Sequence, residues 1–518
     1  MERDPSQSGA CSACRFSRRS FLAGCASAGA GALAFQALPL RSASAAERAK
    51  VRLVYAYTPS TSPIWPNIGY DFEARKTELT EALRKTCPEV EFLPVTVSSG
   101  GEAKNVLEGD KDVDGYLVWI LGIWSGAPKE IVASGRPTLL VDHLYGGSGE
   151  FLIEYAAARR AGRKVAGVSS SRIEDVADAA RRFNMLKEGA TVDAFVAACD
   201  ARRRQTTPTT EPACRPDPVQ TRDVGECLRV LKGKKLLAVG GGWGMPESGK
   251  AAAEVLGIEV VPVDFPELDG AFEKADPEEA ARYAEEWTKK ATKVIEPSAD
   301  EIRRSGAMYA AIRKVMKDRG ADGITINCLS GFYGGHLKAY PCLGFTELND
   351  SSLVGGCEGD IKSALTMMAV GTLTGRPGYI SDPVIDTSRN QIVYVHCVAP
   401  TRVFGSKAPP NPFHIRSHSE DRKGAVVRSL MPTGYMTTSL EIDCGSRQVL
   451  VHRAKAVENV DEDKACRSKL AAEVRGDMEK LLGEWDRWGW HRVTFYGDLK
   501  EPIGELAKAL GMKVVEEA

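Results

Sequence analysis

The chain has 518 residues, of which 43% are hydrophobic and 26% are charged, a composition typical of a globular protein. This length exceeds what one ordinary hydrophobic core supports, so we expect two or three domains. The 68 Lys and Arg residues nearly cancel the 69 Asp and Glu residues, and the chain has no long basic run, which argues against a nucleic-acid partner.

The first 46 residues have the features of an export signal. A twin-arginine pair, Arg18 and Arg19, is followed by a mildly apolar run rich in Ala and Gly that ends at Leu40. The sequence Ala43-Ser44-Ala45 then supplies the small residues typical of a cleavage site. We therefore predict a Tat signal peptide over residues 1–46, the Tat translocase as a partner during export, and a periplasmic or other extracytoplasmic location.

Short apolar runs alternate with amphipathic stretches over residues 47–228. "VRLVYAY" predicts a strand and Phe72–Thr86 a helix, a pattern typical of a parallel sheet covered by helices. A Thr- and Pro-rich segment, 200–226, predicts an exposed connection. It is flanked by Cys199, Cys214 and Cys227, whose spacing fits no zinc motif and leaves a disulfide among them open.

A second α/β domain is expected over residues 229–378. "KKLLAVGG" predicts a strand, Pro277–Val294 a helix, and Asp322–Cys328 a buried strand. The turn at Val239–Gly244 lacks the third glycine of a dinucleotide-binding motif, so we predict no cofactor-binding residues there.

The sequence pattern changes over residues 379–518, where predicted strands such as "NQIVYVHCVAP" and "GYMTTSLEID" are separated by polar turns. This pattern favours a mostly antiparallel barrel, interrupted by a charged helix over 465–485. The predicted fold class is therefore α/β: two Rossmann-like parallel α/β domains followed by a mostly antiparallel β-barrel domain.

Two acids precede a predicted helix in "GGCEGDIKSALTMM". A helix of about 14 residues from Asp360 would run ~20 Å, and the six or so extended steps from Arg376 to Asp382 would return ~20 Å. Asp382 would thus lie level with Glu358. Helix capping, the alternative explanation for the acids, requires no such pairing, and we assign Asp360 alone as the cap.

Two segments of the chain resemble a known family. "CEGDIKSALTMM…TGRPGYISD" resembles the part of L-fucose and L-arabinose isomerases that carries paired metal-binding acids, and "RWGWHRVTFYGDLKEPIGELAKALGMKVV" resembles their closing segment. The resemblance implies an L-fucose isomerase-like fold, a homo-oligomer, and aldose–ketose isomerisation of a small sugar through an enediol. Glu358 and Asp382 would be both the acid/base pair and metal ligands, and His491 the third ligand.

Two carboxylates and one imidazole suit Mn²⁺ or Mg²⁺ and leave coordination positions for sugar oxygens. By resemblance to the arabinose enzymes, His396 is a candidate further ligand; a buried core histidine is the alternative. For His491 the alternative is a ring packed against its neighbouring tryptophans. His418 and Trp490 are candidate substrate contacts. The alternative function is an exported, non-catalytic sugar-binding protein on the same fold.

Overall fold

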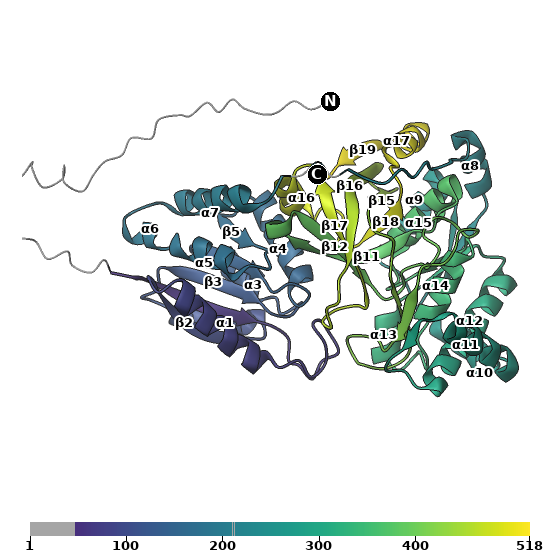
Figure 1. Ribbon diagram of the computed structural model, residues 1–518, viewed down its shortest axis with the longest axis horizontal. Coiled ribbons are helices and arrows are strands. Elements are labelled where there is room, and N and C mark those ends of the chain that lie inside the picture. The colour runs from purple at the N-terminus through teal and green to yellow at the C-terminus, as the bar shows by residue number, and fades with distance from the viewer. Residues whose placement is uncertain (1–46, 210, 212) are drawn as a thin grey trace, which may run out of the picture. The chain divides into compact units, whose positions relative to one another are not determined.

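The computed structural model describes residues 47–209, 211 and 213–518. The predicted signal peptide, 1–46, lies outside the described residues. Within the described part, no helix combines the length and apolar character needed to cross a membrane. Figure 1 traces the chain by colour from purple to yellow.

The first sheet has five parallel strands in the order β2-β1-β3-β4-β5. Strands β3 and β4 are buried along their whole length, as expected for a sheet covered by helices on both faces. The strands are β1 (Ala49–Ala56), β2 (Val90–Val97), β3 (Gly115–Ile120), β4 (Thr138–Asp142) and β5 (Val165–Val168). The helices are α1 (Phe72–Thr86), α2 (Gly100–Gly109), α3 (Ala127–Ala133), α4 (Ser148–Arg160), α5 (Ile173–Arg181), α6 (Asn184–Lys187) and α7 (Val192–Thr206).

The prediction of an exposed connection over 200–226 is wrong in part, because α7 continues through Thr206. Farther along, Oδ1 of Asp217 accepts a hydrogen bond of 2.7 Å from the buried Arg376 guanidinium, which fixes the segment to the rest of the fold. The thiol of Cys199 donates to Ala179 O and that of Cys227 to Ala369 O, so no disulfide joins these two cysteines.

The second sheet has four parallel strands in the order β10-β9-β6-β7. The predicted strand near residue 325 is confirmed as β9, whereas the helix predicted to reach Val294 ends at Lys290. The strands are β6 (Lys235–Val239), β7 (Glu259–Val263), β9 (Gly323–Ile326) and β10 (Val354–Gly356). The helices are α8 (Val224–Leu231), α9 (Glu247–Val255), α10 (Phe265–Glu273), α11 (Pro277–Lys290), α12 (Ala299–Arg319), α13 (Cys328–Tyr333), α14 (Cys342–Asp350) and α15 (Ile361–Thr374).

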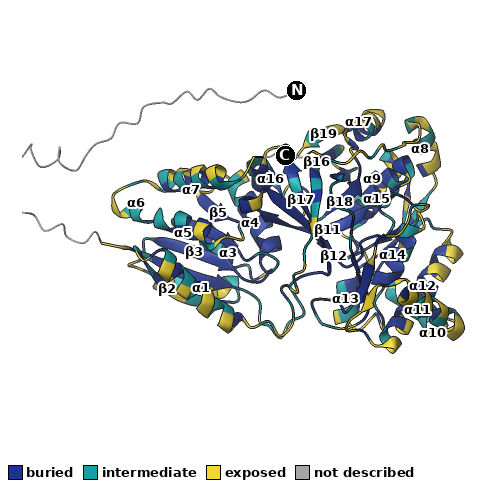
Figure 2. Ribbon diagram, in the orientation of Figure 1, coloured by how far each residue is buried: buried dark blue, intermediate teal, exposed yellow. Residues whose placement is uncertain are grey.

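The C-terminal part is a mostly antiparallel sheet that closes on itself, because β15 pairs with β18 on one side and with β16 on the other. The ring order is β15-β18-β11-β12-β17-β16, and β19 adds in parallel to β16. Figure 2 shows the six ring strands as largely buried, whereas β19 is partly exposed. The strands are β11 (Tyr379–Asp386), β12 (Gln391–His396), β15 (Met436–Asp443), β16 (Gln448–Asn459), β17 (Ser468–Arg475), β18 (Arg492–Tyr496) and β19 (Lys513–Glu516).

Smaller elements complete the fold: a three-stranded sheet in the order β14-β13-β8, and the helices around the ring. They are β8 (Lys293–Val294), β13 (Phe413–Arg416), β14 (Val426–Ser429), η1 (Thr387–Arg389), α16 (Met478–Glu484) and α17 (Lys500–Ala509). The fold is therefore mixed α/β, with two parallel sheets and a mostly antiparallel ring. The domain boundaries at residues 228 and 378 stay a prediction, since residues 48–518 form a single compact unit.

The prediction of a helix over 465–485 is wrong. Its first half is strand β17, which pairs with β12 and β16, and only the short helix α16 follows. The segment is rich in Ala, Lys and Glu, which favour helix, but pairing on both sides of the strand outweighs this local preference.

A buried ion cluster joins strands β16 and β18 to the residue that follows β19. The Glu517 carboxylate accepts hydrogen bonds from Arg492 at 2.7 and 3.0 Å, and its Oε2 lies 2.9 Å from Nδ1 of His452. Burial favours the neutral acid, but the Arg492 charge and the His452 hydrogen bond outweigh it and lower the pKa of Glu517 to about 2. Because Arg492 follows His491 directly, this cluster also fixes the backbone beside the candidate metal ligand.

We expect Glu517→Gln to lower the free energy of unfolding by about 3–5 kcal/mol near neutral pH, because it leaves Arg492 buried without its counter-ion. The carboxylate stabilises the fold above its unfolded pKa of about 4.3, and this stabilisation is lost as the pH falls toward about 2. Urea unfolding of wild type and variant should therefore differ most above pH 5 and converge in acid.

The control is Glu516→Gln, which removes an exposed ion pair with Lys500 and should change the stability by less than about 1 kcal/mol. Equal effects of the two substitutions would contradict the account of the buried cluster.

Candidate metal centre

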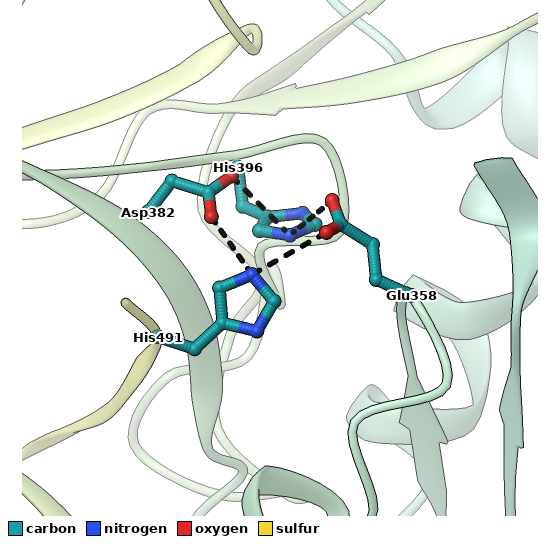
Figure 3. A group of neighbouring side chains, drawn as sticks. All are labelled: Glu358, Asp382, His396 and His491. Carbon is teal, nitrogen blue, oxygen red and sulfur yellow. Dashed lines mark ion pairs between the residues drawn. The ribbon is translucent and has the colours of Figure 1, made fainter. Parts of the chain in front are cut away.

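Four side chains from separate elements converge on one point: Glu358, Asp382, His396 and His491. One possible ligand atom from each lies within 4.8 Å of the others. Figure 3 shows the two carboxylates facing each other, with both imidazole rings directed between them. These are the four residues that the sequence predicts as candidate metal ligands.

Glu358 is presented by a tight turn between β10 and α15. Its φ is 60° and that of Gly359 is 67°, so two consecutive residues adopt left-handed backbone. Such a conformation is unfavourable for Glu and persists only where the surroundings impose it, most often at functional sites. Hydrogen bonds from Gly359 N to Ile326 O and from Trp243 N to Gly359 O hold the turn.

The pairing of β11 with β18 brings His491 to Asp382. These strands are antiparallel, with Ser381 opposite Arg492. One position further along the same register, Asp382 faces His491. The neighbouring strand β12, which pairs with β11 on its other side, ends at His396.

The spacing of the four groups fits a bound cation. Nε2 of His491 lies 2.8 Å from Asp382 Oδ1 and 3.4 Å from Glu358 Oε2. Nε2 of His396 lies 3.7 Å from Asp382 Oδ2 and 3.6 Å from Glu358 Oε1. Ligand atoms bound at about 2.1 Å and at right angles lie about 3 Å apart. Despite the 2.8 Å contact, Asp382 Oδ1 is buried without a hydrogen-bond partner among the described residues, as expected of a metal ligand.

Asp360 has two roles in the structure. Its Oδ1 accepts a hydrogen bond of 3.0 Å from Ser363 N and so caps α15, as predicted. Its Oδ2 lies 2.9 Å from Nδ1 of His491. A carboxylate at Nδ1 holds a hydrogen on that atom, so the lone pair of Nε2 in the neutral ring faces Glu358 and Asp382.

His396 has the opposite arrangement. Its Nδ1 accepts a hydrogen bond of 3.0 Å from the backbone N–H of Cys397, so in the neutral ring the hydrogen is on Nε2. That hydrogen is directed toward Glu358 and Asp382, and the ring is only 1% exposed. Nε2 of His396 is nevertheless buried without a hydrogen-bond partner among the described residues, because both carboxylates lie 3.6 Å or more away. In this tautomer the lone pair of His396 faces away from the two acids, so His491 is the better metal ligand.

Burial and the facing charges shift the pKa values of the group. Burial raises the pKa of Asp382, and the nearby Glu358 carboxylate adds to this effect. For Glu358 burial acts in the same direction, but the hydrogen bond and charge of His491 outweigh it and lower the pKa. Burial disfavours the charged ring of His491, yet the Asp382 charge and the Asp360 hydrogen bond raise its pKa well above the usual range. Asp360 in turn has a pKa of about 2, because His491 outweighs the effect of its burial.

The two candidate substrate contacts lie outside this four-residue group. Nδ1 of His418 lies 3.1 Å from Oδ1 of Asp421, and the ring is buried. Trp490 is partly buried beside His491, and its ring centroid lies 5.1 Å from that of Trp65 and 5.8 Å from that of Trp124. Because Trp124 is 48% exposed, it forms with the partly buried Trp490 an aromatic surface that is partly open to solvent, and the buried Trp65 packs against Trp490.

Sequence reasoning missed the second role of Asp360 and the two tryptophans that contact Trp490. No local signal could reveal the first, because His491 lies 131 positions away. Trp65 and Trp124 have no spacing relation to Trp490 in the sequence, and only the fold brings the three rings together.

Comparison with known proteins identifies distant relatives. No family model matches the chain. A sulfoquinovose isomerase of Clostridium sp. is 22% identical over 250 residues, 46% of this chain and 55% of the relative. A sulfoquinovose isomerase of Alkalicoccus urumqiensis is 29% identical over 150 residues, 28% of this chain and 33% of the relative. That of Priestia megaterium is 23% identical over 220 residues, 41% of this chain and 48% of the relative.

The matches thus span about half, or less, of the length of these curated relatives. They also correct the sequence analysis: the resemblance to L-fucose and L-arabinose isomerases named the wrong family, because the curated proteins that match are sulfoquinovose isomerases. The short motifs around residues 358 and 491 contain the candidate metal ligands, but they did not identify the right relatives.

We expect Asp360→Asn to weaken metal binding by about 10–100-fold with little change in thermal stability. An Asn oxygen can still cap α15, but its NH₂ group then faces Nδ1 of His491 and no longer orients the ring. Titration with Mn²⁺, followed by the electron paramagnetic resonance of the free ion, measures the affinity.

The matched control is Asp223→Asn, which changes the N-cap of α8 in the same way, at a residue with no hydrogen bond to a histidine. Wild-type Mn²⁺ affinity in Asp360→Asn would contradict the orienting role.

Proposed function

We propose that this protein is a metal-dependent sugar isomerase that interconverts an aldose and a ketose. The observation that carries the proposal is the convergence of Glu358, Asp382 and His491 at ligand distances in a buried position. The relatives named sulfoquinovose isomerase support the same class of reaction.

Glu358, Asp382 and His491 would hold the metal ion. Two carboxylates and one imidazole favour Mn²⁺, with Mg²⁺ as the alternative, over metals that prefer thiolates. When bound, such a cation supplies a Lewis acid that polarises neighbouring sugar oxygens.

The two carboxylates can carry the proton transfers of the isomerisation. One of Glu358 and Asp382 accepts the proton from C2 of the aldose while the other delivers a proton to O1, which gives the enediol. The first then returns its proton to C1 and the second accepts the proton of O2, which gives the ketose. Because each proton removed is later returned, the reaction needs no external oxidant or reductant.

The aromatic surface beside His491 supports a sugar substrate. The rings of Trp124 and Trp490 offer apolar faces against which the C–H groups of a sugar can pack. Since the matching relatives act on sulfoquinovose, that sugar is the first substrate to test, followed by neutral aldoses.

We expect the protein loaded with Mn²⁺ to convert one of these aldoses to its ketose. Glu358→Gln should lower kcat by about 10²–10⁴-fold, because it removes a group that transfers protons and binds the metal. Quantification of aldose and ketose by chromatography measures turnover.

The control is Glu267→Gln, which removes an ion pair with Arg319 at the protein surface and should leave kcat unchanged. Sugar binding without turnover in wild type would reject the isomerase and favour the alternative, a sugar-binding protein.

We further propose that the Tat pathway exports the folded protein after Mn²⁺ has been inserted in the cytoplasm, where competing Cu²⁺ and Zn²⁺ are controlled. Replacement of Arg18 and Arg19 by Lys should retain the protein in the cytoplasm, as measured by cell fractionation and metal analysis. Unchanged export, or only zinc or copper in the exported protein, would contradict the proposal.

A further inference from the structure

A second cavity, of about 230 Å³, lies at the carboxyl ends of three neighbouring strands of the first sheet. Trp119 comes from β3, Asp142 ends β4, and Ser170 follows β5. In open parallel sheets, ligands bind outside the carboxyl ends of the strands. None of the four side chains of the candidate metal centre lines this cavity.

Two donors that line the cavity have no acceptor among the described residues. Trp119 is 4% exposed, and its Nε1 has no hydrogen-bond partner. The Nε of Arg75, from α1, is likewise buried without a partner, although Nη1 of the same residue lies 2.6 Å from Glu78. Both groups can only donate, and buried donors are normally paired, so the cavity fits a ligand that carries acceptors.

The charges around the cavity are nearly balanced. Among the lining residues, Asp142 already accepts hydrogen bonds from Ser148 at 3.1 Å and from Ser169 at 2.9 Å. Burial raises the pKa of Asp142 to about 7, which reduces its negative charge near neutral pH. Glu462 lies 3.3 Å from Nζ of Lys464, so its charge is balanced. The cationic lining residues Arg75, Arg172 and Lys464 each have an acid partner, in order Glu78, Asp175 and Glu462. The unpaired N–H groups, rather than an excess of positive charge, therefore favour an anion.

The C-terminal part of the chain closes the cavity. Lys464 belongs to the connection between β16 and β17, and its Nζ lies 5.9 Å from the ring centroid of Tyr145. The next residue, Ala465, donates a hydrogen bond of 3.0 Å to Pro66 O. The volume is below the range of about 300–1,000 Å³ typical of pockets for drug-sized ligands, so the ligand has few atoms.

We propose that this cavity binds a small oxyanion, such as a sulfate, phosphate or sulfonate group. Its oxygens accept hydrogen bonds from Trp119 Nε1 and from Nε of the charged Arg75 guanidinium.

Calorimetric titration of the full chain with sulfate at constant ionic strength tests the proposal, and inorganic phosphate and methanesulfonate serve as parallel probes. We expect saturable binding that Arg75→Gln weakens by about tenfold or more and Trp119→Phe by several-fold, because each removes one hydrogen bond to a charged ligand. Glycerol, which has a similar size but no charge, should not compete.

The matched control is Arg84→Gln, which removes the same charge from the same helix at an exposed residue that does not line the cavity. The titration is repeated with a metal chelator, because an ion at the metal centre could itself take up sulfate. Absence of saturable binding, its loss with the chelator, equal weakening by Arg75→Gln and Arg84→Gln, or unchanged binding in Trp119→Phe would each overturn the proposal.

Discussion

The antiparallel pairing of β11 with β18 is the constraint on which the candidate metal centre depends. The two strands come from positions more than a hundred residues apart, and their register sets Asp382 opposite His491. The ring of the C-terminal sheet holds this register, because β18 also pairs with β15 and β11 also pairs with β12. The buried ion cluster around Glu517 and Arg492 then stabilises the end of β18 beside the histidine. The same strands therefore stabilise the fold and position the residues of the site.

The turn before α15 links the second sheet to this ring. Glu358 reaches the site through left-handed backbone, and Asp360, two residues later, both begins the helix and orients His491. One short segment therefore contributes a metal ligand and the hydrogen bond that sets the tautomer of another ligand. The same reasoning separates the two histidines, since the backbone N–H of Cys397 gives His396 the tautomer of a donor.

The parts of this arrangement that depend on neighbouring residues, such as helix and strand lengths, could be predicted from the sequence. The helix and strand lengths between Glu358 and Asp382 predicted that the two acids lie level, and α15 has the predicted start. The prediction failed where the secondary structure depends on contacts between residues far apart in the chain. The segment of β17 was predicted as helix because its pairing partners are distant in the sequence. The orienting role of Asp360 was missed for the same reason, and short motifs led to the wrong family. The cavity lined by Trp119 and Arg75 had no sequence signal, because its lining residues come from segments far apart in the chain.

A crystal structure of the protein grown with Mn²⁺, with anomalous scattering recorded to locate the ion, tests the central claim most directly. The account predicts one anomalous peak bonded to Glu358, Asp382 and Nε2 of His491, with Nδ1 of His491 still hydrogen-bonded to Asp360 and with Nε2 of His396 outside bonding distance. A peak elsewhere, or an ion bound by His396 while His491 stays unbound, would contradict it.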